Sequence, residues 1–168
     1  MRTKLVLPLL LLLVIVCSSF TFNFNQPEDP LRNFARKYRS LDESTTVSLG
    51  SLVMDIGSIF IEDREAAAIL RKISHMRVVT LEDATLVDDA DVKRLYEQAQ
   101  RQGFEELIKV RDGGEEVHVM MREKKDIIRG LLVMVYDKDG NEFTAVSVKG
   151  RVTFEQLQQT DFWKDLME

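Results

Sequence analysis

Residues 103–150, GFEELIKVRDGGEEVHVMMREKKDIIRGLLVMVYDKDGNEFTAVSVKG, decide the fold because their apolar residues recur largely with a period of two. Successive side chains of a β-strand point to opposite faces, so this period is typical of strands. Four strands are predicted, over 104–111, 115–123, 129–136 and 142–149. Asp112-Gly113-Gly114 and Asp139-Gly140 separate the first pair and the last pair, as tight hairpin turns do.

The predicted strands differ in the faces that they bury. In 115–123, Val117, Val119 and Met121 alternate with a more polar set that includes His118. One face of this strand is therefore expected to be buried and the other, with His118, to meet solvent. The segment 131–136 is apolar throughout, which predicts a central strand covered on both faces.

Helical patterns precede the strand run, over 31–40, 50–60, 62–73 and 88–102. The last of these has Gly103 directly after it, as a left-handed C-cap. Two further segments, 45–49 and 76–81, have strand character. The predicted fold class is α+β, a mostly antiparallel sheet of four to five strands with helices packed on it.

Residues 1–19 have the pattern of a secretory signal peptide. Arg2 and Lys4 precede the apolar run 5–16, and small residues follow it. The run is shorter than the roughly 20 apolar residues that span a bilayer, although a retained anchor is the alternative. Processing either follows Ser19 or makes Cys17 a lipidated first residue. The predicted organisation is a signal peptide at 1–19, a linker at 20–30 and a single α+β domain at 31–168.

Composition excludes several classes of function. The 168 residues include 23 Lys and Arg and 28 Asp and Glu, which gives a formal charge of −5. This balance argues against nucleic-acid binding, which needs a clustered basic excess. A single Cys excludes an intrachain disulfide framework and a multi-cysteine metal site. Contact with a membrane is expected only through the signal or a lipid anchor.

No motif for catalysis or for a cofactor occurs in the sequence. His75 and His118 lack any metal-ligand spacing, and neither G-x-S-x-G nor a P-loop is present. The sequence therefore predicts no catalytic residue, no cofactor and no metal, and the two histidines are expected at the surface. A site built from dispersed residues would instead need one of them to meet carboxylates in a pocket.

The C-terminal segment carries an apolar cluster. It consists of Phe162, Trp163, Leu166 and Met167, which share one face of a helical turn. This cluster either docks onto the domain or forms a contact with a partner. The partner would be an unknown protein or a second copy of the chain.

Residues 103–115, GFEELIKVRDGGE, follow an amphipathic helix and the strand MRVVTL at 76–81. LLVMV at 131–135 and FTAVSVKG at 143–150 complete the order. In this order the chain resembles the uncharacterised domain-of-unknown-function family 4252, small exported proteins of Bacteroidota, over about residues 31–160. The resemblance implies that the protein is exported and has the predicted α+β fold. It implies no activity, cofactor or catalytic residue.

Together these patterns predict an exported cell-envelope protein, periplasmic or in the outer envelope and lipid-anchored if Cys17 is modified. A non-enzymatic binding module is the expected role. A small hydrolase or metal-dependent enzyme with a site of dispersed residues is the alternative.

Overall fold

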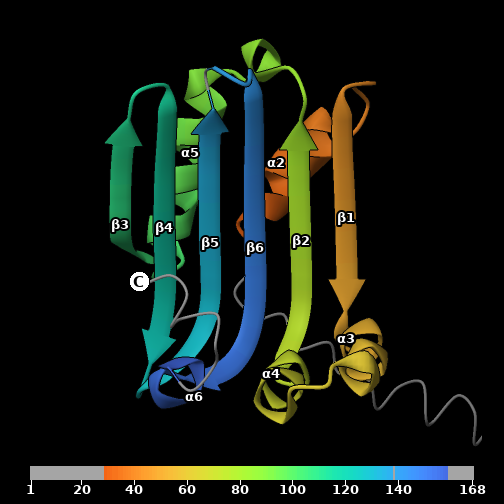
Figure 1. The fold of residues 1–168 in the computed structure, drawn as a ribbon. Coiled ribbons are helices and arrows are strands. Elements are labelled where there is room, and N and C mark those ends of the chain that lie inside the picture. The colour runs from red at the N-terminus through yellow and green to blue at the C-terminus, as the bar shows by residue number, and fades with distance from the viewer. Residues whose placement is uncertain (1–28, 138, 159–168) are drawn as a thin grey trace, which may run out of the picture.

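The protein, described here by a computed structural model over residues 29–137 and 139–158, has the predicted α+β class (Figure 1). Its sheet is antiparallel, with the strand order β1-β2-β6-β5-β4-β3. The strands are β1 (Ser44–Gly50), β2 (Ile73–Leu81), β3 (Glu105–Asp112), β4 (Glu115–Lys124), β5 (Ile127–Asp137) and β6 (Glu142–Thr153). The helices are α2 (Leu31–Tyr38), α3 (Ser51–Gly57), η1 (Ser58–Phe60), α4 (Arg64–Leu70), η2 (Ala84–Leu86), α5 (Asp89–Arg101) and α6 (Phe154–Gln158). Within the described ranges, none of these helices has the length and apolarity that crossing a membrane requires.

The sheet has six strands, whereas four to five were predicted. Both strand-like segments before the four-strand run join the sheet, and β2 inserts between β1 and β6. The predicted number was too low because β1, with the sequence STTVSLG, is a polar edge strand whose apolar alternation is weak. Strands β6 and β5 occupy the centre, so the predicted central position of 131–136 is confirmed.

Tight turns align the ends of β3, β4, β5 and β6. Gly113 adopts a φ of 53° in the predicted turn between β3 and β4. In the predicted turn between β5 and β6, the Asp137 carboxylate accepts the backbone N–H of Gly140 at 2.8 Å. The turn between β4 and β5 places Lys125 and Asp126 at φ values of 55° and 58°, a left-handed conformation in residues other than glycine.

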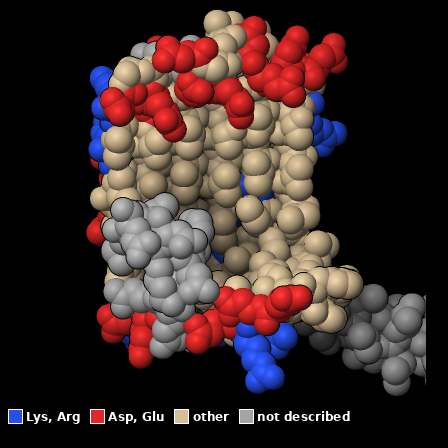
Figure 2. Space-filling model, viewed as in Figure 1, with Lys and Arg blue, Asp and Glu red and all other residues tan. Residues whose placement is uncertain are grey.

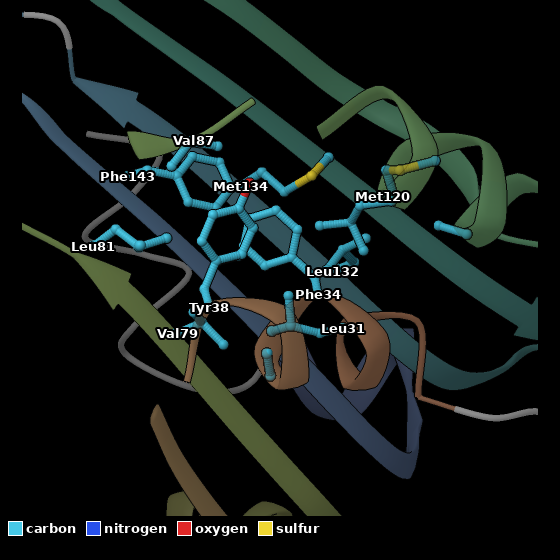
Figure 3. Close-up of a cluster of buried hydrophobic side chains, with 14 of the residues drawn as sticks. Leu31, Phe34, Tyr38, Val79, Leu81, Val87, Met120, Leu132, Met134 and Phe143 are labelled. Carbon is cyan, nitrogen blue, oxygen red and sulfur yellow. The ribbon is translucent and has the colours of Figure 1, made fainter. Parts of the chain in front are cut away.

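Helices α2 and α5 cover one face of the sheet, behind the strands in the view of Figure 1. Their apolar sides and the covered face of the sheet form one hydrophobic cluster (Figure 3). Phe143 of β6 belongs to this cluster and is 1% exposed, with its ring 5.3 Å from that of Phe34 on α2. The buried residues of the cluster are Leu31, Phe34, Ala35, Tyr38, Val79, Leu81, Ala84, Val87, Leu95, Ala99, Phe104, Met120, Leu132, Met134, Phe143 and Ala145.

Helix α5 begins and ends as its sequence predicts. The Asp88 side chain accepts the backbone N–H of Ala90 at 2.8 Å, which caps the first turn. Gly103 has a φ of 82°, and the N–H of Phe104 returns to the carbonyl of Ala99 at 3.0 Å. Phe104 is thereby folded back onto the domain, where it is 3% exposed.

A polar clasp joins α2 to α5 at the edge of the core. The Asp91 side chain, 9% exposed, accepts the Tyr38 hydroxyl at 2.6 Å, pairs with Arg94 at 2.6 Å and contacts the Lys37 ammonium. Burial raises the pKa of Asp91, but the hydrogen bonds from Lys37 and Tyr38 outweigh it and lower the pKa overall. The carboxylate therefore stays ionised where it bridges the two helices.

The last residues of the predicted linker 20–30 pack against the domain. Asp29 and Pro30 are buried, and Asp29 accepts the N–H of Leu31 at 3.1 Å at the start of α2. The Asp29 carboxylate also pairs with Arg77 of β2 at 2.9 Å. This pair fastens the beginning of α2 to the sheet.

Candidate functional site

The sheet face opposite α2 and α5 carries almost no charge. Residues that alternate with the buried core point to this face, and the register aligns them across the strands. The middle row is Val47, Val78, Val146, Val133, Val119 and Ile108. The flanking rows are Thr45, Thr80, Thr144, Val135, Val117 and Val110, and Leu49, Met76, Val148, Leu131, Met121 and Glu105, whose carboxylate at the β3 edge is the one charged side chain of these rows. We call these three rows the open face, which Figure 2 shows from the front.

The open face is exposed most at the two edges of the sheet. Val47 on β1 is 43% exposed, and Ile108 and Val110 on β3 are 40% and 49% exposed. The apolar residues of the inner strands are half-buried. A contiguous apolar surface of this extent is typical of an interaction site.

Two expectations about burial are corrected here. In β4 the face predicted to be buried, with Val117 and Val119, belongs to the open face, whereas Met120 of the alternate set is 0% exposed. The segment 131–136 was expected to be covered on both faces, but the described helices cover only the side of Leu132 and Met134. Both sets of β5 are apolar, so the pattern alone does not indicate which one the helices contact.

Acidic side chains border one end of the open face. Glu142, Asp137, Glu115 and Asp112 face one another directly across β6, β5, β4 and β3. Glu82 and Glu43 continue the line where β2 ends and β1 begins, and the N–H of Glu82 binds the carbonyl of Glu43 at 3.0 Å. This acidic rim, made of Glu43, Glu82, Asp112, Glu115, Asp137 and Glu142, forms the red band along the upper edge in Figure 2.

The opposite end of β1 leads into a second apolar surface. Helix α3 and η1 expose large side chains where α3 follows β1 in Figure 1. Phe60 is 79% exposed, Ile59 74% and Leu52 71%. We call this surface the apolar knob; its members are Leu52, Val53, Ile56, Ile59 and Phe60.

His118 lies between two carboxylates on the covered side of β4, where a surface position was predicted. Its Nδ1 is 2.8 Å from Glu106 and its Nε2 is 3.0 Å from Glu116, and its side chain is only 16% exposed. The ring meets the edge of Tyr96 on α5 with centroids 6.0 Å apart. Helix α5 shields this position, which explains why a polar residue here is not solvated.

His118 and Glu116 line a cavity of about 430 Å³ between α5 and the sheet. Arg111 donates to Glu116 at 2.6 Å, and this bond, with a smaller contribution from His118, lowers the pKa of Glu116 to about 2. Both ring nitrogens of His118 contact carboxylate oxygens, so a bound molecule would reach either nitrogen only by displacing a carboxylate. The pocket therefore combines a histidine with carboxylates, but in a saturated ion-pair network.

The low pKa of Glu116 predicts a loss of stability in acid. The unfolded chain takes up this proton near pH 4.5 and the folded chain near pH 2, so the unfolded state binds more protons between these values. The stability that Glu116 contributes is complete above pH 4.5 and is lost as the pH falls toward 2. We expect E116Q to flatten the pH dependence of the free energy of unfolding in this window.

Urea unfolding from pH 2 to pH 6 measures this effect. The control is E97Q, which removes a more exposed carboxylate from the pair of Glu97 with Arg101, 3.8 Å apart. If E116Q and wild type lose stability in parallel between pH 4.5 and 2, the contact with Arg111 does not hold the carboxylate ionised.

His75 occupies a separate place on β2. Its Nε2 is 3.8 Å from the Asp29 carboxylate, which Arg77 contacts more closely. Burial lowers the pKa of His75, and this effect exceeds the opposing influence of Asp29. Strands β6 and β5 separate His75 from His118, so the two histidines do not converge. In the part of the chain that the structure describes, no group of three or more His, Cys, Asp or Glu side chains could hold a metal ion.

The remaining residues predicted to have a role lie outside the described residues. This holds for the signal peptide at 1–19 with Cys17, and for the apolar cluster of Phe162, Trp163, Leu166 and Met167. Sequence reasoning missed the acidic rim, although each member stands at or next to the end of a strand. The acids flanking the hairpin turns at 112–115 and 137–142 were the signal that could have revealed it.

A comparison with known proteins identifies a family for this domain. The family model of the domain of unknown function DUF4252 matches residues 38–160, which includes all six strands. None of the curated proteins and none of the solved structures matches the chain.

Proposed function

The chain belongs to the DUF4252 family, and we propose that it is an exported cell-envelope protein that binds another protein through the open face of its sheet, without catalysis. It would act in the periplasm or outer envelope after removal of the signal at 1–19, or from a lipid anchor at Cys17. The partner we propose presents an apolar surface bordered by Lys and Arg. The apolar knob, and the cluster of Phe162, Trp163, Leu166 and Met167, would extend the contact.

The observation that carries this proposal is the open face, charged only at Glu105 on its β3 edge, beside the acidic rim. Six strands about 4.8 Å apart and three rows about 7 Å apart span roughly 29 by 20 Å, or about 600 Å². A standard protein interface buries about 800 Å² per partner, so the open face with part of the apolar knob reaches the required size. The apolar rows supply a hydrophobic contact, as the centre of such interfaces does.

The acidic rim supports a basic partner. Like charges directly opposite each other on neighbouring strands cost about 0.2–1 kcal/mol per pair. Lys and Arg of a partner would relieve this repulsion and add attraction at the rim. An anionic lipid surface would increase the repulsion, so the rim favours a protein over a membrane. A second copy stacked with the two rims together would meet the same repulsion.

Photo-crosslinking in the native envelope tests the proposal. A photoreactive amino acid at Val133, in the middle of the open face, should form adducts with another protein, and mass spectrometry should place them in a segment with apolar residues and Lys or Arg. The same group at Lys93, on the exposed side of α5, is the control. Adduct yield at Val133 should fall in high salt because the rim contact is screened.

Three other outcomes would overturn the proposal. Adducts confined to lipid, to a second copy or to residues 159–168 of the same chain would each assign the open face to a different occupant. Equal yields at Val133 and Lys93 would show that the open face is not a specific surface. Mass analysis of the mature N-terminus from the same fraction should begin after Ser19 or at a lipidated Cys17, and an intact Met1 would overturn export.

A small hydrolase or metal-dependent enzyme is the second candidate, favoured by His118, which lines a cavity with Glu116 and also contacts Glu106. In that case a ligand would have to displace one of the two carboxylates from the imidazole. Turnover of a hydrolysable ester or phosphoester that disappears in H118Q and persists in H75Q would support the enzyme over the binding module.

A further inference from the structure

A basic cavity lies at the end of the sheet opposite the acidic rim. Its volume is about 790 Å³, and it opens where β2 and β5 begin and β4 and β6 end. Every charged residue of its lining except Glu123 is a Lys or an Arg, in a chain whose formal charge is −5. The lining consists of Lys72, Ser74, Gly103, Arg122, Glu123, Lys124, Lys125, Arg129, Lys149, Gly150 and Arg151.

The register explains why these cations gather on the helix side of the sheet. Arg122, Gly130 and Lys149 are direct neighbours across β4, β5 and β6, one row beyond Met120 and Leu132 of the core. Helix α5 ends at Arg101, and Gly103 behind it borders the cavity. Gly103 and Gly150 contribute no side chain to the lining.

Arg122 is held in a fixed orientation. Its guanidinium lies over the Phe104 ring at 5.0 Å from the centroid, as in a cation–π contact. Phe104 in turn packs on Gly130, where an added Cβ would stand 2.7 Å from the ring. A guanidinium positioned in this way loses little freedom when it binds a ligand.

Two guanidinium groups in the cavity have unused donors. Nη1 of Arg122 and Nε of Arg129 are buried, and neither has a hydrogen-bond partner. Neither arginine forms an ion pair with an acid in residues 29–137 or 139–158. Burial and, to a smaller extent, the charge of Arg129 lower the pKa of Arg122. Buried donors without acceptors are costly, so their arrangement favours an anionic ligand that accepts from both.

We propose that this basic cavity binds a phosphate-bearing ligand, with Arg122 and Arg129 donating to its oxygens and the surrounding lysines balancing its charge. A phosphate monoester offers three acceptor oxygens and close to two negative charges at pH 7, whereas the diester of a phospholipid headgroup offers fewer of both, and the guanidinium group matches the geometry of either. The source is either a soluble phosphate compound or the headgroup of a phospholipid. The site is independent of the open face, which lies on the other side of the sheet.

Titration of the mature protein with inorganic pyrophosphate, followed by calorimetry, tests the proposal. We expect saturable binding that R122Q and R129Q each weaken about tenfold or more, the usual effect of losing a charge-assisted hydrogen bond. The control K93Q removes one positive charge from the exposed side of α5, away from the cavity, and should change the affinity less than twofold. A circular dichroism spectrum shows whether each variant is folded, and K124Q replaces R122Q if that variant is not.

Vesicles distinguish the two sources of phosphate. Sedimentation with phosphatidylglycerol vesicles that R129Q abolishes, and no sedimentation with phosphatidylcholine vesicles, would indicate a headgroup. Pyrophosphate binding without vesicle binding would indicate a soluble compound. The proposal is overturned if pyrophosphate does not bind at millimolar concentration, or if R122Q, R129Q and K93Q all bind it as wild type does. Neither result would affect crosslinking at Val133.

Discussion

Replacing Phe143 with alanine should lower the free energy of unfolding by about 3–5 kcal/mol, the usual cost of removing a buried aromatic ring. Phe143 is 1% exposed and packs between α2 and the sheet, with its ring 5.3 Å from Phe34 and 6.3 Å from Tyr136 (Figure 3). Its removal leaves a cavity that the surrounding residues cannot close, because α2 and β6 are both fixed by other contacts. A domain of this size would lose roughly 10 °C or more in Tm.

V146A is the matched control, on the same strand but on the open face. Val146 is half-buried, so losing its two methyl groups should cost only about 1 kcal/mol. Urea unfolding of both variants measures the difference between the two sides of β6. If F143A loses less than about 1.5 kcal/mol, or if V146A loses more than F143A, the hydrophobic core does not lie on the side of β6 that carries Phe143.

The sequence predicted the strands, but it did not predict which side of the sheet is buried. The period of two and the turn residues predicted β3 to β6 and two of their turns, because both signals are local. The buried side was not predicted, since Leu132 and Met134 alternate with Leu131, Val133 and Val135 and both sets are apolar. Side-chain size was the better indicator: the covered face carries Leu, Met and Phe in its centre, and the open face mainly Val and Thr.

The open face and the basic cavity, which carry the two proposals, both form only because of the order of the strands in the sheet. Arg122, Lys149 and Lys72 are far apart in the sequence, and only the placement of β2 beside β6 gathers them at one end of the sheet. Local patterns cannot predict such a placement, because the chain passes through α5, β3, β4 and β5 before it returns to β2 as β6. The negative total charge also concealed the basic cavity, since a sum does not report how charges are distributed.

Replacing Asp91 with alanine should lower the free energy of unfolding by about 2–3 kcal/mol, since the Tyr38 hydroxyl would lose a charged acceptor in a buried position. Tyr38 is 3% exposed and donates to Asp91 at 2.6 Å. The ion pairs of Asp91 contribute less to the free energy of unfolding. The side chains of Lys37 and Arg94 are 54% and 66% exposed, so water hydrates their charges when the carboxylate is removed. D91N keeps an acceptor for Tyr38 and should cost about half as much.

The control for this prediction is E97A on the same helix. Glu97 pairs with Arg101 at 3.8 Å, and the two side chains are 44% and 69% exposed, so its removal should cost at most about 0.5 kcal/mol. Both variants lose a carboxylate from α5, so the difference between their losses in free energy of unfolding reports how much the burial of Asp91 contributes. If D91A costs no more than E97A, the contact between α2 and α5 depends on Leu31, Phe34 and Leu95 alone, and the clasp contributes no stability. A loss near 2–3 kcal/mol instead makes Asp91 the polar residue that fixes how the two helices lie on the sheet.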